Sequence, residues 1–106
     1  MHNMVYLIGR IAKDLEVEKT DDSNKATITI AVQRSFKNEN GIYECDFVPC
    51  ILWNGIAVHT SEYCQKGDLV GIKGRIQTID EKLVVVADKI SFLSKQQVTE
   101  EGEVSE

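Results

Sequence analysis

The segment KATITIAVQR, residues 25–34, alternates between two kinds of side chain and indicates a β protein. Successive side chains of a strand point to opposite faces, so strict alternation predicts a strand with one buried face. The positions expected to face the core are Ala26, Ile28, Ile30 and Val32. The alternate positions, at which threonine and glutamine occur, are expected to face outward.

Further strands are predicted on both sides of this segment. An apolar run over residues 3–13, interrupted at Gly9, precedes it, and the turn-forming letters TDDSN, residues 20–24, separate the two. After it, the pair Asn40-Gly41 predicts the tip of a hairpin, which leads into a strand over residues 43–53. Two more strands are predicted over residues 69–78 and 82–92, joined by a tight turn near Asp80-Glu81.

The last two strands are expected to bury one row of side chains each. These rows are Val70, Ile72 and Ile76 in the first of them, and Val84, Val86, Ile90 and Phe92 in the second. The segment GIAVHTSEYCQKG, residues 55–67, has helical spacing of its larger side chains and is predicted as the helix, with Gly67 placed to end it.

Five strands with one short helix between the third and the fourth are the element order of the OB-fold, an all-β Greek-key barrel. We therefore expect an OB-fold domain over residues 1–94. The letters of residues 95–106 have the composition of a solvated, disordered acidic tail. The order of elements alone leaves the function open, because one fold supports many functions.

Length and composition fit a single globular domain. The chain has 106 residues, of which 42% are hydrophobic. No basic leader precedes the first apolar stretch, which breaks at Gly9-Arg10, too early for a signal peptide or a membrane span. We therefore expect a cytoplasmic protein that has no membrane partner.

The charge of the chain is uneven along its length. The formal net charge is −5, and the last twelve residues carry one lysine against four glutamates, which leaves about −2 for the body. This balance argues against a uniformly basic protein that coats nucleic acid. A local basic face remains compatible with it, because association depends on where the charge lies.

The segment DFVPCILWNG, residues 46–55, places two large aromatic side chains away from the core. Alternation puts Val48, Cys50 and Leu52 inward, and puts Phe47, Pro49, Ile51 and Trp53 outward. Outward aromatic rings are either covered by a partner or stack on a ligand, and each nucleobase offers a flat face for stacking. The alternative, that one or more of these rings fill the core, stays open at this point. Proline removes one donor from a ladder, so an edge position or a bulge is expected near Pro49.

Basic residues are interleaved with these aromatic residues. Phe36 adds a third candidate ring, flanked by Arg34 and Lys37. Cations that neutralise phosphates beside rings that hold bases give salt-dependent and sequence-tolerant binding of single strands. The other basic candidates are Arg10, Lys13, Lys66, Lys73 and Arg75.

A metal site and a catalytic site are both poorly supported. The residues considered as ligands, Cys45, Cys50, His59 and Cys64, lack the close C-x2-C spacing of structural zinc sites. The segment GIKG, residues 71–74, lacks the spacing of a phosphate loop, and neither histidine stands in a nucleophile motif. We expect reduced cysteines, no cofactor, no metal and no enzymatic activity.

Three segments together resemble the bacterial single-stranded DNA-binding protein (SSB) family. They are VYLIGRIAKDLEV at residues 5–17, ATITIAVQRSFKNENGIYECDFVPCILWN at residues 26–54, and EYCQKGDLVGIKGRIQT at residues 62–78. The resemblance covers nearly the whole body, to about residue 93, with its motifs in the right order. It implies sequence-independent binding and protection of single-stranded DNA during replication, recombination and repair.

The resemblance also implies roles for individual residues. It implies that Phe36, Phe47 and Trp53 stack on bases. It also implies that the basic residues contact phosphates, namely Lys66 together with Arg10, Arg34, Lys37, Lys73 and Arg75. The family is a homotetramer in which the N-terminal strand pairs subunits, which implies an interface at His2, Asn3, Met4 and Tyr6.

Two departures from the family pattern affect what is expected. The connection TIDEK, residues 78–82, is tight and lacks an aromatic residue where the family has a long hairpin that carries one, so we expect a smaller site or weaker binding. Family members that recruit replication and repair enzymes end in an acidic tip with Pro-Phe, whereas this sequence ends in TEEGEVSE. Recruitment of such partners therefore stays open. The sequence also leaves open whether the protein prefers DNA or RNA, and whether its gene is of chromosomal, phage or mobile-element origin.

Two other functions remain as alternatives. One is an accessory OB-fold protein of a primosome-like replication complex, acting as a dimer. The other is an adaptor whose exposed Phe47 and Trp53 bind a protein partner. A tetramer in solution favours the SSB interpretation, and salt-sensitive quenching of Trp53 by oligo-dT favours DNA over a protein partner.

Overall fold

The computed structural model describes residues 1–19 and 23–95. Most of the turn predicted at TDDSN, and all of the predicted tail after residue 95, lie outside the described residues. The described elements are β1 (Val5–Ile11), β2 (Glu16–Lys19), β3 (Asn24–Lys37), β4 (Tyr43–Trp53), α1 (Asn54–Tyr63), β5 (Leu69–Ile79) and β6 (Lys82–Ser94).

The strands form one sheet that closes on itself. Its order is β1-β5-β6-β4-β3-β2, and an additional pairing of β1 with β3 completes the barrel. The β4–β6 pairing is parallel and covers two residue pairs, whereas the other pairings are antiparallel. Five long strands with one helix between β4 and β5 confirm the predicted OB-fold. The short β2, which pairs with the start of β3, is a strand that the sequence did not predict.

The core follows the alternation read from residues 25–34. The side chains of Ala26, Ile28 and Ile30 on β3 are fully buried, and so are those of Cys50 and Leu52 on β4. Burial of an Ile or Leu side chain contributes about 1.5–3 kcal/mol to stability, so this row fixes which face of each strand points inward. The remaining core comes from neighbouring elements and includes Ile11, Ala57, Val70, Ile72, Val85 and Ala87.

The β5–β6 pair departs from the expected alternation. Its register shifts between Lys73 and Gly74, and a Cβ atom on Gly74 would collide with the Val86 carbonyl. Beyond this shift Ile76 is 43% exposed, so its predicted inward position is wrong. Phe92, also predicted to face inward, lies beside a second register shift near the end of the pair and is exposed.

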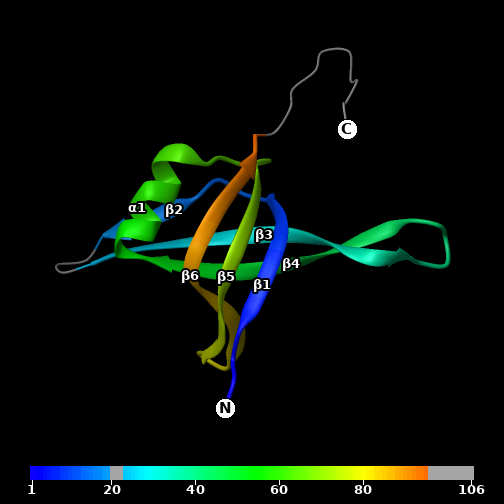
Figure 1. Cartoon of the computed structure of the whole chain (residues 1–106), viewed down its shortest axis with the longest axis horizontal. Helices are drawn as coiled ribbons and strands as arrows, with labels where there is room; N and C mark the ends of the chain where they lie inside the picture. Colours follow the sequence, from blue (N-terminus) through cyan, green and yellow to red (C-terminus); the bar gives the residue numbers. More distant parts are fainter. Residues whose placement is uncertain (20–22, 96–106) are drawn as a thin grey trace.

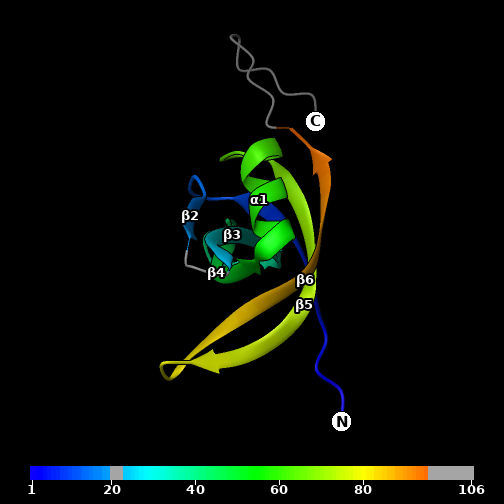
Figure 2. The same cartoon turned by 90° about the vertical axis from the view of Figure 1, so that its left-hand side faces the viewer.

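Two hairpins extend beyond the barrel, as Figures 1 and 2 show. The ends of β3 and β4 form a two-stranded arm, and Asn40-Gly41 lies in its turn, as predicted. The β5–β6 hairpin reaches away from the barrel in a second direction and reverses in two residues, Asp80 and Glu81. The tight turn is therefore confirmed, although the strands it joins are long.

The helix is shorter than predicted. It begins directly after β4, packs against β3, and ends at Tyr63. Cys64 follows in an extended conformation, and its backbone N–H donates to the Thr60 carbonyl. Gly67, predicted as the residue that ends the helix, lies in the turn before β5 with φ of 94° instead. From this turn its N–H donates to the Ile11 carbonyl, which joins the turn to β1.

Candidate functional site

The outward face of the β3–β4 ribbon carries a row of paired residues from the helix end of the barrel to the arm. Antiparallel register places Lys25 opposite Trp53, Ala31 opposite Phe47, and Lys37 opposite Tyr43. Between these pairs lie Thr27 opposite Ile51, Thr29 opposite Pro49, and Gln33 opposite Cys45. Trp53, Phe47 and Tyr43 thus share one face of β4, the face away from the core. We call this row the aromatic face.

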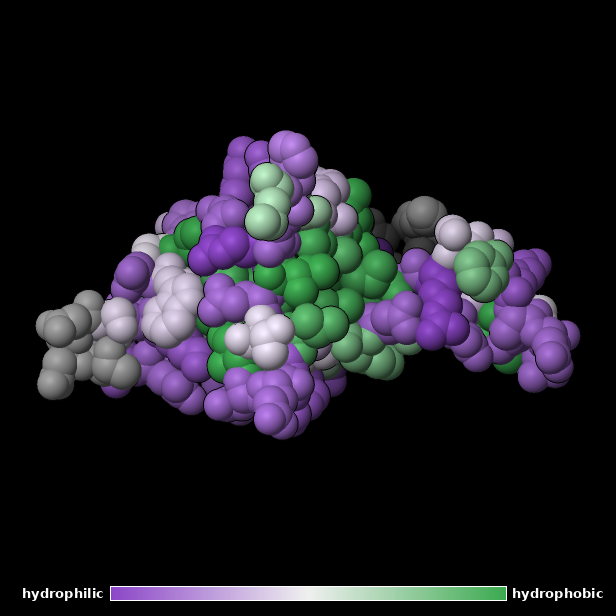
Figure 3. Space-filling view, turned by 90° about the horizontal axis from the view of Figure 1, so that it is seen from below, coloured by the Kyte–Doolittle hydropathy of each residue, from purple (hydrophilic) through white to green (hydrophobic). Residues whose placement is uncertain are grey.

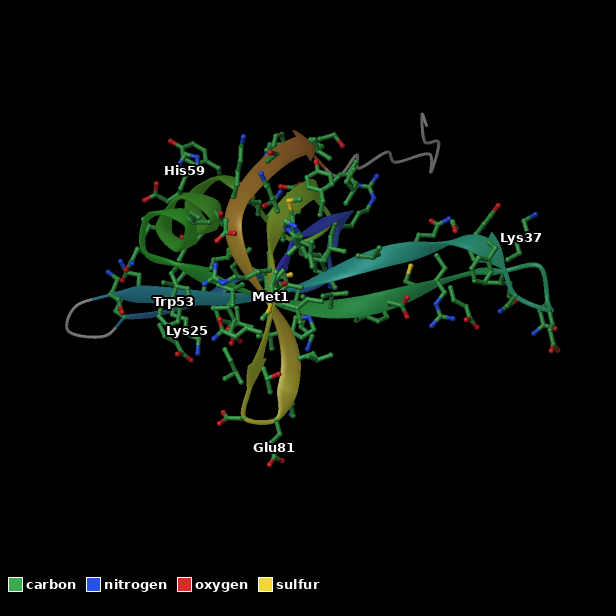
Figure 4. The ribbon with its side chains drawn as sticks, turned by 60° about the horizontal axis from the view of Figure 1, so that its bottom comes forward. Met1, Lys25, Lys37, Trp53, His59 and Glu81 are labelled. Carbon is green, nitrogen blue, oxygen red and sulfur yellow. The ribbon has the colours of Figure 1, made fainter. Side chains whose placement is uncertain are left out.

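Trp53 stands at one end of the aromatic face, where β4 passes into α1. Asn54, with φ of 53°, turns the chain into the helix, and its side-chain oxygen accepts a hydrogen bond from the Asn24 N–H at 3.4 Å. This turn leaves the indole on the outer face, 41% exposed. The Lys25 ammonium lies 5.7 Å from the ring centroid, within cation–π range. Figure 4 shows Lys25 and Trp53 side by side.

Phe47 lies in the middle of the aromatic face and is 65% exposed, so the predicted outward position is confirmed. Ala31, its partner on β3, also pairs with Arg10 of β1, which places Arg10 in the same cross-strand row. The guanidinium donates to the Gly67 carbonyl at 2.9 Å. Arg10 also lines a hollow of about 320 Å³ with Gln33 and Cys45. The register therefore places a predicted cation and a predicted stacking ring in one cross-strand row, with Ala31 between them.

The predicted orientation of the β4 side chains is correct for every inward residue. One outward residue, Ile51, is nevertheless buried. Ile51 lies on the outward face, yet it is 5% exposed, because β6 pairs with β4 at this point and places Val86 beside it. Pro49 lies one residue before this parallel pairing, where β3 alone borders β4 in the described sheet. The expected edge position near Pro49 is thus confirmed, and β4 has no register shift there.

The far end of the aromatic face lies on the arm. The Lys37 ammonium is 5.6 Å from the centroid of the Tyr43 ring, and Tyr43 is 46% exposed. Figure 4 shows Lys37 and Trp53 at opposite ends of the ribbon. Phe36 is 68% exposed and lies in the segment of β3, between Gln33 and Lys37, where the register shifts.

Arg34 lies on the opposite face of the arm, among carboxylates. Its guanidinium donates to both oxygens of Asp46, at 2.7 and 3.1 Å, and to Glu44 at 2.8 Å. Asn38 donates to the second Glu44 oxygen at 3.0 Å and accepts from the N–H groups of Asn40 and Ile42. The hydrogen bonds from Arg34 lower the pKa of Asp46, and those to Asp46 raise the pKa of Arg34. The structure does not bring Arg34 to the aromatic face.

The other predicted basic residues are spread around the barrel. Arg75 is ion-paired with Asp88 at 2.7 Å, and Lys73 lies opposite Tyr6 on the outer face of the β1–β5 pair. Lys66 follows α1, and its backbone N–H donates to Asp14 at 3.4 Å. Of the six cations that the family resemblance assigns to phosphate contact, Arg10 and Lys37 are therefore the two that the register places in the rows of the aromatic face.

The residues predicted for subunit contact lie in and before β1. Met4 and Tyr6 are 71% and 58% exposed, and they alternate with the partly buried Val5 and Leu7. Asn3 is held against β5, because its amide donates to the Ile76 carbonyl and accepts from the Ile76 N–H, at 2.8 and 2.9 Å. His2 is exposed.

Sequence reasoning missed two residues of the aromatic face, Lys25 and Tyr43. Both stand at the first position of a predicted strand, and neither is among the predicted binding residues. The alternation itself carried the signal, because Tyr43 lies four residues before Phe47 on the same strand face. The facing of Lys25 and Trp53 needed the register, which the sequence did not supply.

The three cysteines are unpaired and lie apart in the fold. Cys45 is exposed and Cys50 is buried, as their alternation predicted, and burial raises the pKa of the Cys50 thiol to about 12. Cys64 is half-buried, and burial together with Asp68 raises the pKa of its thiol. Within residues 1–19 and 23–95, no three His, Cys, Asp or Glu side chains are grouped so that they could hold a metal ion. No helix in this part of the chain has the length and apolar character that a membrane span needs.

Comparison with known proteins gives consistent matches. Residues 2–93 match the model of the single-strand binding protein family. Single-stranded DNA-binding protein B of Bacillus subtilis is 51% identical over 79 residues, which are 74% of this chain and 70% of that protein. Single-stranded DNA-binding protein 2 of Streptococcus pyogenes is 38% identical over 112 residues, a match that covers 96% of this chain and 69% of that protein. The second single-stranded DNA-binding protein of Mycobacterium smegmatis has a similar fold, with a TM-score of 0.73 at 18% identity over 87% of this chain and 89% of that one.

Proposed function

Because the chain belongs to the single-strand binding protein family, it binds single-stranded DNA without sequence preference and without catalysis, and we propose that the aromatic face of β3–β4 holds the strand. The observation that supports this proposal is the outward row of Phe47 and Trp53, with a lysine in cation–π contact at Trp53 and Arg10 in the row of Phe47. A monomeric barrel has no structural need to expose rings of this size.

The proposed mechanism divides the work between rings and cations. A base stacks on the face of Trp53 or Phe47, and such stacking contributes about 1–3 kcal/mol per base whichever base it is. Lys25 reaches across from the neighbouring strand, so it can leave the indole for the phosphate next to the stacked base. Each phosphate neutralised releases counterions, which makes the affinity salt-dependent.

The predicted residues contribute unequally to this proposal. Phe47, Trp53, Arg10 and Lys37 lie in the rows of the aromatic face, whereas Phe36 lies on the arm within the register shift. Arg34 and Arg75 already form ion pairs with carboxylates, so their charge is partly neutralised before DNA arrives. Lys66 and Lys73 remain proposed contacts for a strand that continues around the barrel.

We further propose that copies of the chain pair through β1. Met4, Tyr6 and Ile8 form an exposed row of large side chains on the outer face of this strand, and a second copy would remove them from water. Figure 3, seen from the end that carries the N-terminus, shows apolar surface in the middle of the molecule between two polar ends. A homotetramer, as in the family, would place several aromatic faces on one particle and lengthen the bound strand.

The cellular role follows from the binding. Strands exposed during replication, recombination and repair are the ligands that we propose, and the proposed place of action is the cytoplasm, where bacterial DNA lies. Replication and repair enzymes are proposed only as partners that share the same DNA.

Titration of Trp53 fluorescence with oligo-dT tests this function. Trp53 is the only tryptophan, so its emission reports on one end of the aromatic face. We expect quenching on addition of oligo-dT and recovery as salt is raised, together with a loss of affinity of about tenfold or more in Trp53→Ala. Emission that does not change with oligo-dT would contradict the proposal and favour a protein partner for the exposed rings.

A further inference from the structure

The geometry points to Tyr43, supported by Lys37, as a further base-stacking position at the arm end of the aromatic face. The inference rests on the proposed function and extends the DNA path beyond the barrel onto the arm. Tyr43 shares its strand face with Phe47 and Trp53. The register shift between Gln33 and Lys37 places its extra residues on β3, so the alternation of β4 continues through all three rings.

The two ends of the aromatic face are built alike. At each end a lysine on β3 faces an aromatic residue on β4 directly across the ladder, and the ammonium lies 5.7 Å from the Trp53 centroid and 5.6 Å from the Tyr43 centroid. A ring on a cross-strand pair with a cation above it offers both elements of single-strand recognition, the stacking surface and the phosphate contact. What supports Trp53 as a platform therefore supports Tyr43 equally.

The spacing suits a continuous strand. Four residues separate Tyr43 from Phe47, which is about 14 Å at the rise of a β-strand. Six residues separate Phe47 from Trp53, or about 20 Å. At the 3.4 Å spacing of a stacked strand, the step from Phe47 to Tyr43 adds up to about four nucleotides to the path.

The charges of the arm favour this face over the other. Glu44 and Asp46 alternate with Tyr43 along β4, and both are turned to the opposite face, where they bind the Arg34 guanidinium. The Asn38 side chain holds the second Glu44 oxygen on that same face. The carboxylates nearest to Tyr43 in the strand are thus directed away from its ring, and Lys37 is the charge that faces it.

A tryptophan placed at position 43 tests the inference directly. In the Trp53→Phe background, which keeps an aromatic ring at the barrel end, Tyr43→Trp becomes the only tryptophan and reports on the arm. We expect oligo-dT of about 30 nucleotides to quench it, and Tyr63→Trp in the same background, an exposed tyrosine position on α1, to stay unquenched. Quenching that is equal at both positions, or absent at position 43, overturns the inference.

Affinity supplies a second measurement that does not depend on a new fluorophore. Tyr43→Leu should weaken binding of the long oligo-dT about five- to tenfold, near the lower end of the range for one stacked base, and Tyr43→Phe should bind as the parent does. Tyr63→Leu serves as the matched control and should have no effect. If Tyr43→Leu binds as tightly as Tyr43→Phe, the inference fails.

The two proposals fail in different ways. If oligo-dT does not quench Trp53 in the parent protein, the proposed function itself is wrong. If it quenches Trp53 in the parent but not Trp at position 43, the strand follows the barrel and leaves the arm, and the proposed function stands.

Discussion

At the scale of single residues, parity along β3 decides whether a charge lies on the face that we propose binds DNA. Even-numbered positions of β3 fill the barrel as Ala26, Ile28 and Ile30, and the same row continues onto the arm as Arg34. Odd-numbered positions carry Lys25 and Lys37, one at each end of the aromatic face. Arg34 therefore has different surroundings from Lys25 and Lys37, although the three residues lie on the same strand.

Removal of these charges should have unequal effects on the salt dependence of binding. Each phosphate contact on a single strand contributes about 0.7 to the slope of log K against log salt. Lys25→Gln and Lys37→Gln should each reduce the slope by about that amount, whereas Arg34→Gln should reduce it by much less, because Asp46 and Glu44 already neutralise the guanidinium. Titrations with oligo-dT at several salt concentrations measure the slopes, and an equal loss in all three variants would show that Arg34 leaves its carboxylates for DNA.

The pH dependence of this ion pair follows from the direction of the shift. Arg34 lowers the pKa of Asp46 below its ordinary value of 3.8, so the pair is formed fully above that pH and is lost as the pH falls through the lowered pKa. Near neutral pH the slopes above are therefore measured with the pair intact.

At the scale of elements, the sequence predicted the strands well where one face is buried. The bounds of β4 were predicted without error, because its alternation, its proline and the Asn-Gly turn before it agree. Prediction from the sequence failed where the position of one strand depends on its pairing with another. The short β2 has too few residues to show a period, and the fate of Ile76 and Phe92 depends on register shifts between β5 and β6 that neither strand encodes alone.

The candidate site was predictable to a similar extent. Phe47 and Trp53 were found from alternation within one strand, and their exposure confirms the outward positions. The ion pairs of Arg34 and the pairing of Lys25 with Trp53 depend on which residues face each other across the ladder. Such pairings belong to the tertiary structure and leave no periodic pattern in the sequence.

The β5–β6 turn offers a test at this scale. Asp80 and Glu81 both have positive φ, at 52° and 65°, as both central residues of a type I′ hairpin turn do. A side chain in this region costs about 1–2 kcal/mol and glycine avoids that cost, although glycine is also more flexible when unfolded. Glu81→Gly should therefore stabilise the protein by about 0.5–1 kcal/mol in thermal unfolding.

Glu81→Ala is the control for this prediction. It removes the same side-chain charge but keeps a Cβ atom at positive φ, so the melting temperature should stay near that of the parent. Unfolding must be followed at one protein concentration, because association of chains changes the apparent stability. A melting temperature that rises equally in both variants would assign the effect to the charge and contradict the strain.

At the scale of the whole molecule, the two faces for which we propose functions lie on different strands of the barrel. The aromatic face runs along β3 and β4, and the exposed row of Met4, Tyr6 and Ile8 lies on β1. Arg10 connects them, since it belongs to β1 and pairs through Ala31 with the row of Phe47. Assembly through β1 would thus set how the strand passes from one copy to the next.

Charge introduced into the β1 row tests this assembly. Each chain has a mass of 11.9 kDa, and we expect a particle of four chains in light scattering. The double substitution Met4→Glu and Tyr6→Glu should reduce the mass to that of one or two chains, because carboxylates would be buried without partners in the interface. Tyr63→Glu on α1 is the matched control and should leave the mass unchanged. A parent protein that is already monomeric would refute assembly through β1.

The arm has a further consequence for how such measurements behave. It is a two-stranded ribbon beyond the barrel, and isolated ribbons of this kind are only marginally stable. On the face of the arm that continues the core-facing row of the barrel, Arg34 forms ion pairs with Glu44 and Asp46. In the barrel itself the same row consists of buried apolar side chains. Dissolved salt screens exposed ion pairs as it screens phosphate contacts. A rise in ionic strength therefore weakens the ion pairs of the arm as well as its contacts with DNA phosphates. The arm should become more mobile under the same conditions that release the DNA.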